Sequence, residues 1–224
     1  MRYIKKVSLP DCFQHAVKKI LSEEDWSEFQ NPEKLETAKY IIEKEQKNLC
    51  VYCEQRISNF PKDCHIEHLR PRSIDKKHNT FNYSNLAVSC NSSKDQQIKS
   101  VIQYTGLTCG HKKGERYDEK KFLSPVELEN ISDYFVFDFI SGSISFSELN
   151  QERAAYMIDL LNLNDKGLQI ARRNALINLR KIIQENNKTK NEKKSALIKI
   201  LDVNNKKLRP YHTFLRFCFK DLLK

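Results

Sequence analysis

Apolar side chains recur at helical spacing in the first part of the chain. One stripe lies between residues 10 and 29 and predicts a helix over that range. Asn31 followed by Pro32 is typical of a helix start, with Asn31 as N-cap, and predicts a second helix that ends near residue 47. The side chains that we expect these two helices to bury are Phe13, Val17, Ile20, Leu21, Leu35, Ala38, Ile41 and Ile42.

The last part of the chain predicts one β-hairpin and four helices. Residues 134–146 are typical of a hairpin with its turn at Ser141 and Gly142. The later apolar stripes predict helices over 152–163, 166–185, about 193–201 and 210–223, and a polar linker covers 186–191. Together with the first two helices, this pattern predicts an α+β fold that is mostly α-helical.

The middle of the chain has no such periodicity. Residues 49–114 contain five of the seven cysteines and four of the six histidines. Metal bonds can replace part of a hydrophobic core, so this segment predicts a metal-organised unit. We therefore expect an N-terminal helical region at 1–48, a metal-organised core at 49–118, and a hairpin with a C-terminal helical region at 119–224.

Composition and charge narrow the class of protein. The 224 residues include 39 Lys and Arg and 29 Asp and Glu, which gives a net charge of +10. This charge favours an anionic partner such as nucleic acid, although a basic surface without such a partner is the alternative. The chain lacks the run of about 18 apolar residues that a membrane helix needs. It also lacks an apolar signal segment, so we expect a cytoplasmic protein with no membrane span. None of its five glycines lies in a nucleotide-binding motif.

Four cysteines of the central segment have a spacing typical of a zinc site. Cys50 and Cys53 form a Cys-x-x-Cys pair, which either shares a tetrahedral Zn²⁺ or acts as a redox pair. Cys90 and Cys109 would complete a closed structural site of four thiolates. Cytoplasmic thiols stay reduced, so we favour zinc. The remaining central cysteine, Cys64, is expected in the core.

A carboxylate and an imidazole stand next to each other between the two halves of this site. Glu67 could bind a divalent cation such as Mg²⁺, and His68 could act as a general base on water. Neighbours on an extended strand project to opposite faces, which would separate these two roles. An imidazole titrates near neutral pH, so His68 would need little tuning as a base. His65 is either a further metal or phosphate contact or a partly buried histidine.

The order of these motifs resembles that of the zinc-stabilised HNH endonucleases, which have a ββα-metal core. The segments Cys50–Glu54, His65–Ser73, Asn85–Cys90 and Cys109–Gly114 carry the resemblance, which covers residues 49–118. The sequences of these segments are similar to one branch in particular. This branch is PtuB, the HNH effector of Septu anti-phage systems, which also accompanies some retrons.

The resemblance implies a role for each matching residue. His68 matches the general base and Glu67 the acidic ligand of a catalytic Mg²⁺ or Mn²⁺. Asn85 matches the asparagine that holds the loop and orients the base. The four ligands of a structural Zn²⁺ would be Cys50, Cys53, Cys90 and Cys109.

The third residue of the catalytic metal site departs from the family pattern. Many members have asparagine directly after the last cysteine, where this chain has Gly110. We expect His111 to take its place. A rival register starts the same element at Cys90, which would make Asn91 the ligand and leave Cys109 unexplained.

The function that the resemblance implies is hydrolysis of phosphodiester bonds, with DNA favoured, in an anti-phage system that includes an ABC-type ATPase similar to PtuA. The alternatives are an RNA (tRNA) nuclease that acts with a retron reverse transcriptase and its msDNA, and a zinc ribbon that binds nucleic acid or protein without cleavage.

Basic residues that either line a phosphate path or are simply solvated are Arg70, Arg72, Lys76, Lys77, Lys94, Lys112 and Lys113. Aromatic residues that either stack on bases or pack in the core are Trp26, Tyr134, Phe135 and Phe137.

Overall fold

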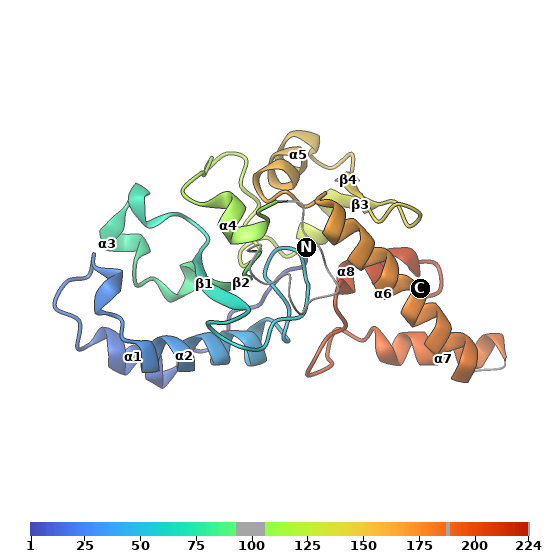
Figure 1. The fold of residues 1–224 in the computed structure, drawn as a ribbon, viewed down its shortest axis with the longest axis horizontal. Helices are drawn as coiled ribbons and strands as arrows, with labels where there is room; N and C mark the ends of the chain where they lie inside the picture. Colours follow the sequence, from blue (N-terminus) through green and yellow to red (C-terminus); the bar gives the residue numbers. More distant parts are fainter. Residues whose placement is uncertain (93–105, 187–188, 224) are drawn as a thin grey trace.

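The computed structural model describes residues 1–92, 106–186 and 189–223, and its fold is mixed α+β and mostly helical (Figure 1). The helices are α1 (Asp11–Val17), α2 (Asn31–Tyr40), α3 (Lys76–Asn79), α4 (Cys109–Lys113), α5 (Gln151–Leu160), α6 (Lys166–Asn186), α7 (Lys190–Ile200) and α8 (His212–Cys218). The strands form two antiparallel pairs, β1 (Cys64–His68) with β2 (Leu86–Cys90) and β3 (Phe135–Phe137) with β4 (Ile144–Phe146). The predicted fold class is confirmed at this level.

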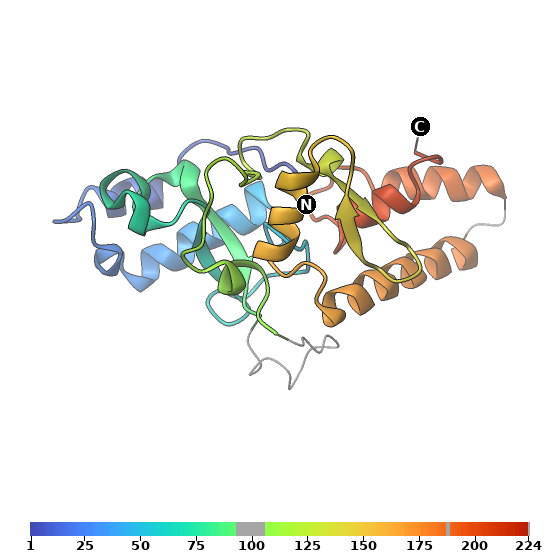
Figure 2. The same cartoon turned by 90° about the horizontal axis from the view of Figure 1, so that it is seen from above.

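The helices gather at the two ends of an elongated molecule. Helices α1 and α2 lie at one end, α6 and α7 lie at the other, and the β1–β2 pair with α4 lies between them (Figures 1 and 2). The central segment with its ligand-type residues is therefore flanked on both sides by helices.

The β1–β2 pair and α4 form a compact strand–strand–helix unit. Cys64 lies opposite Cys90 in the register, and His68 lies opposite Leu86. All five residues of β2 are buried, as its apolar sequence leads one to expect, and α4 packs against this strand. This places the ends of β1, β2 and α4 close together.

The predicted helix over 10–29 is wrong beyond α1, which ends at Val17. The carboxylate of Glu28 accepts hydrogen bonds from the backbone amides of Leu21 and Ser22, so this segment follows a loop. The side chain of Leu21 is 96% exposed rather than buried.

The second predicted helix is confirmed with a shifted start and an altered end. Gln30 is the N-cap, and Asn31 is the first helical residue. After α2 the chain continues as a π-helical turn over Ile41–Glu45. None of the residues 31–36 is buried, and Leu35 is 47% exposed, because other elements do not cover the first turns of α2. The residues of this helix that are buried as expected are Ala38, Ile41 and Ile42.

The hairpin and the later helices lie close to the predicted ranges. Gly142 in the hairpin turn has a φ of +75°, a conformation that favours glycine. Helix α7 begins three residues earlier than predicted, because Thr189 and Glu192 form a capping box. The helix predicted over 210–223 is confirmed only over α8. Among the described helices, including the 21-residue α6, none is long and apolar enough to cross a membrane.

One hydrophobic cluster connects the three regions expected from the sequence. It includes Phe29 before α2, Leu86 in the centre, and Phe214 in α8. Backbone hydrogen bonds also join the C-terminal region to the centre, for example from the Tyr211 amide to the Glu54 carbonyl at 2.8 Å. The boundaries at 48 and 118 remain predictions, but the flanking regions share their core with the central unit.

Candidate metal and catalytic site

The four predicted zinc ligands lie together. Their sulfur atoms are all within 4.8 Å of one another and all four residues are buried. The distance between the Cys53 and Cys90 sulfurs is 3.7 Å. Sulfurs at about 2.3 Å from one tetrahedral ion stand roughly 3.8 Å apart, so the sulfurs would need to move by at most about 1 Å to bind Zn²⁺.

The environment of the cluster also favours a bound ion. Burial raises the pKa of the Cys109 thiol, so charged thiolates need a cation in this dry site. The Cys90 amide donates a hydrogen bond to the Cys50 sulfur at 3.3 Å. Cys64 is buried outside this cluster, in agreement with the expected core role.

Glu67 is a buried carboxylate with a different partner on each oxygen. Its Oε1 accepts a hydrogen bond from the Tyr52 hydroxyl at 3.1 Å and forms an ion pair with Lys113 Nζ at 2.9 Å. Its Oε2 lies 3.4 Å from Nε2 of His65. Burial opposes ionisation, but the hydrogen bond from His65 and the charge of Lys113 outweigh it and lower the pKa of Glu67. The carboxylate is therefore charged at neutral pH.

His68 is held as a neutral imidazole. Its Nε2 lies 3.0 Å from the Thr80 carbonyl oxygen, and the ring packs edge-on against Trp26 with centroids 4.6 Å apart. A carbonyl can only accept, so Nε2 carries the proton and Nδ1 has the free lone pair. Burial lowers the pKa of His68 to about 4, so the expectation that this imidazole titrates near neutral pH is wrong.

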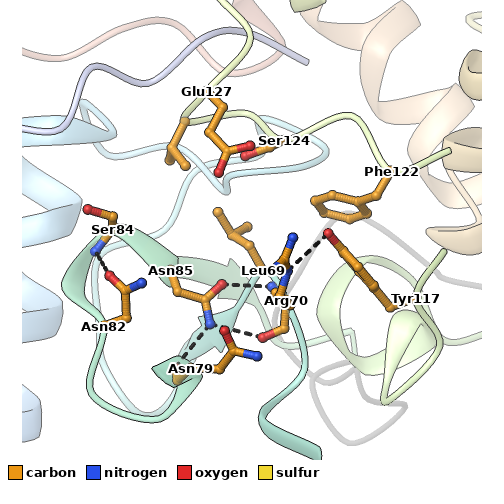
Figure 3. Close-up of a pocket in the computed structure, with 11 residues that line it drawn as sticks. Leu69, Arg70, Asn79, Asn82, Ser84, Asn85, Tyr117, Phe122, Ser124 and Glu127 are labelled. Carbon is orange, nitrogen blue, oxygen red and sulfur yellow. Dashed lines mark hydrogen bonds between the residues drawn. The ribbon is translucent and has the colours of Figure 1, made fainter. Parts of the chain in front are cut away.

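Asn85 ties together the two ends of the loop that follows β1 (Figure 3). Its Oδ1 accepts a hydrogen bond from the Arg70 amide at 2.8 Å. Its Nδ2 donates to the carbonyls of Arg70, at 2.9 Å, and Asn79, at 3.1 Å. The next carbonyl along the chain, that of Thr80, is the one that Nε2 of His68 contacts.

Gly110 leaves space for the side chains of β1. A Cβ atom at this position would lie 2.5 Å from Oε2 of Glu67 and 2.7 Å from Nε2 of His65. No larger residue fits here while these two side chains keep their places. The next residue, His111, is exposed and stacks on His65 with ring centroids 4.5 Å apart.

Asn91 also contacts His65. Its Oδ1 lies 2.7 Å from Nδ1 of His65, and its Nδ2 donates to the Pro61 carbonyl at 2.9 Å. Both residues that the sequence suggests as the third metal ligand, His111 and Asn91, therefore lie against His65.

The structure separates the basic residues that the sequence grouped together. Lys113 was expected on a phosphate path or in solvent, and both expectations are wrong, because it is buried and pairs with Glu67. Arg70 is exposed and pairs with Glu119 at 2.6 Å. Arg72 is partly exposed, and Lys76, Lys77 and Lys112 are exposed. Lys94 lies outside the described residues.

For the aromatic residues, the structure favours packing. Tyr134, Phe135 and Phe137 are buried in the core. Trp26 packs against the core and against His68.

Tyr52 and Lys113 are partners of Glu67 that were not expected from the sequence. Lys113 stands four residues after Cys109, so both lie on one face of α4, and helical spacing carries this signal. The contact of Tyr52 depends on the tight turn between Cys50 and Cys53 and has no comparable signal in the sequence.

The site thus combines a four-cysteine cluster that could hold zinc with a charged carboxylate and a neutral imidazole on the neighbouring strand. No protein-family model matches the chain. Over 159 residues the chain is 29% identical to a Vibrio cholerae (serotype O1 biovar El Tor) protein named "Retron Vc95 putative HNH endonuclease", and the match covers 69% of this chain and 70% of that protein. The chain is therefore distantly similar to a protein that carries the name of an HNH endonuclease. The expected PtuB branch remains a prediction.

Proposed function

We propose that this protein is a metal-dependent HNH endonuclease that hydrolyses phosphodiester bonds in nucleic acid, preferentially in DNA. The observation that carries the proposal is the pairing on β1 of a charged Glu67 with a neutral His68 whose Nδ1 lone pair is free. A zinc ribbon that only binds needs no such pair. The net charge of +10 suits a polyanionic substrate.

Each residue of the site has one task in this proposal. His68 accepts a proton from water at Nδ1, and the resulting hydroxide attacks the phosphorus in line. The bond from phosphorus to the 3′-oxygen breaks, after which the leaving oxygen takes up a proton from water. Glu67 and His111 would hold a Mg²⁺ or Mn²⁺ ion, which would stabilise charge on the phosphate and on the leaving 3′-oxygen. Asn85 positions His68 through the Thr80 carbonyl. The four cysteines hold a structural Zn²⁺ that fixes β2 and α4 relative to each other.

The test is cleavage by the purified, zinc-loaded chain of plasmid DNA and of total RNA, with and without added Mg²⁺ or Mn²⁺. The proposal predicts nicks that require the added cation and that Glu67→Gln abolishes while zinc content stays the same. Cleavage of RNA alone would favour the RNA-nuclease alternative. No cleavage of either substrate by the chain, alone or with its partner, would favour the zinc-ribbon alternative.

We further propose that the enzyme is the effector of an anti-phage system and acts in the cytoplasm with an ABC-type ATPase. The retron named in its relative supports a defence setting and keeps a reverse transcriptase with its msDNA as alternative partners. Co-expression with an ABC-type ATPase of such a system should yield a complex on gel filtration. Association only with the reverse transcriptase and msDNA would favour the retron alternative.

A further inference from the structure

We propose that His65 is a ligand of the divalent cation, paired with Glu67, and that Asn91 is its positioning residue. This inference rests on the proposed nuclease function and names the residues that make its cation site. The sequence left open whether His65 is a ligand or only a partly buried histidine.

A nitrogen of His65 and an oxygen of Glu67 approach each other closely. Nε2 of His65 and Oε2 of Glu67 are 3.4 Å apart. Two ligands at right angles, each about 2.1 Å from one ion, stand roughly 3.0 Å apart, so a small rotation of either side chain suffices. Oε1 of Glu67 is already occupied by Tyr52 and Lys113, which leaves Oε2 for the cation.

The imidazole of His65 has a fixed orientation. Its Nδ1 atom lies 2.7 Å from Oδ1 of Asn91, whose amide nitrogen donates to the Pro61 carbonyl and thereby fixes the oxygen toward the ring. The amide oxygen can only accept, so Nδ1 of His65 carries a proton. A metal-bound histidine characteristically donates its other ring N–H in this way. A cation bound between His65 and Glu67 would take the place of the hydrogen that Nε2 shares with Oε2 of Glu67.

Gly110 lets the two ligand atoms lie side by side, because a Cβ at this position would lie 2.7 Å from Nε2 of His65 and 2.5 Å from Oε2 of Glu67. The His65 side chain is 26% exposed, and exposed His111 stacks on its ring. An ion can therefore enter from solvent, and His111 stands where it can add a further ligand by turning.

An imidazole ligand also predicts which ions bind. Imidazole suits Ni²⁺ and Zn²⁺ better than Mg²⁺, whereas carboxylate alone suits Mg²⁺ and Mn²⁺. The site should therefore bind Ni²⁺ and Mn²⁺ more tightly than Mg²⁺, and the preference for Ni²⁺ should weaken without His65.

The test measures the binding of Mn²⁺ to the zinc-loaded full chain by electron paramagnetic resonance. Pulsed measurements then detect nitrogen atoms that are coupled to the bound ion. In wild type we expect imidazole nitrogen coupling. His65→Ala should weaken Mn²⁺ binding about 100-fold and remove the nitrogen coupling that comes from His65, leaving at most that of His111, and Asn91→Ala should weaken binding about tenfold. His65→Gln, which keeps a donor toward Asn91, serves if the alanine variant does not fold.

Two controls use the other histidines. His15→Ala, at an exposed position on α1, should change neither affinity nor coupling. His111→Ala should retain nitrogen coupling from His65.

Unchanged Mn²⁺ affinity and coupling in His65→Ala would overturn the inference. If wild type binds Mn²⁺ through His65 but cleaves no nucleic acid, the site stands and the nuclease proposal fails. If wild type cleaves and His65→Ala binds Mn²⁺ normally, the nuclease stands and the inference fails.

Discussion

Lys113 and Glu67 form an ion pair in which both side chains are almost fully buried, with 2.9 Å between Nζ and Oε1. The same ammonium group donates a hydrogen bond to the carbonyl of His68 at 3.1 Å. One lysine of α4 therefore holds the carboxylate of Glu67 through charge and the backbone of His68 through a hydrogen bond. This connects the position of α4 directly to the proposed catalytic pair on β1.

Replacing Lys113 by methionine should destabilise the protein strongly. The variant leaves the Glu67 carboxylate buried without its cation, which typically costs about 3–5 kcal/mol. Urea unfolding measures the difference in the free energy of unfolding. Lys112→Met, at the exposed neighbouring position, is the matched control and should stay within about 0.5 kcal/mol of wild type. An equal effect of the two substitutions would show that the ion pair between Lys113 and Glu67 adds nothing to the free energy of unfolding.

Local sequence signals predicted the parts of the site that depend on short spacing. Cys50 and Cys53 are separated by two residues, and such a pair indicates a metal site before any tertiary structure is known. The Glu67–His68 pair is visible for the same reason. The hairpin over 134–146 and helix α6 follow from periodicity alone.

The parts that could not be predicted depend on contacts between distant segments. The neutral state of His68 results from burial beside Trp26, which lies 42 residues earlier in the chain. The orientation of His65 depends on Asn91, 26 residues later. The loop after α1 is bonded to Glu28, whose carboxylate accepts hydrogen bonds from the Leu21 and Ser22 amides, and an apolar stripe does not reveal these bonds.

Loss of zinc should unfold the central unit. Binding of a structural zinc contributes about 10–16 kcal/mol to small metal-organised domains. Wild type should contain one zinc ion per chain by elemental analysis, and Cys53→Ser should be insoluble or unfolded by circular dichroism. Cys12→Ser, at a partly exposed cysteine outside the cluster, should behave like wild type. A folded, zinc-free Cys53→Ser would refute the structural role.

Acid should destabilise the fold through His212. Its side chain is buried in α8, neither ring nitrogen has a hydrogen-bond partner among the described residues, and burial lowers its pKa to about 4. In the unfolded chain this imidazole binds a proton below about pH 6.5. Between these two pKa values the unfolded state binds more protons than the folded state. The contribution of His212 to the free energy of unfolding is therefore fully present above pH 6.5 and is lost as the pH falls toward 4.

His212→Leu should remove this contribution. Leucine is of similar size and does not titrate, so the loss of stability between pH 7.5 and pH 4.5 should be smaller than in wild type by up to about 3 kcal/mol. Urea unfolding at the two pH values measures the difference. Parallel losses in the two proteins would mean that His212 does not control acid stability.

Removing the Asn85 side chain should impair cleavage more than folding. Asn85→Ala loses three hydrogen bonds to the loop after β1, each worth about 1 kcal/mol. We expect faster amide hydrogen exchange in residues 70–80 and a cleavage rate reduced by about tenfold or more, since small displacements of a catalytic group are costly. The exposed Asn82→Ala is the control, because its side chain caps only its own turn. A rigid loop with normal cleavage in Asn85→Ala would contradict the positioning role.

The general-base role of His68 is tested most directly by single-turnover cleavage of a labelled DNA duplex in the presence of Mg²⁺ or Mn²⁺. His68→Ala should keep its zinc and its fold, yet cleave at least about 100-fold more slowly than wild type, the lower range for loss of a general base. His78→Ala, an exposed imidazole that pairs with Asp75, should cleave at the wild-type rate. A His68→Ala protein that cleaves as fast as His78→Ala would contradict the account.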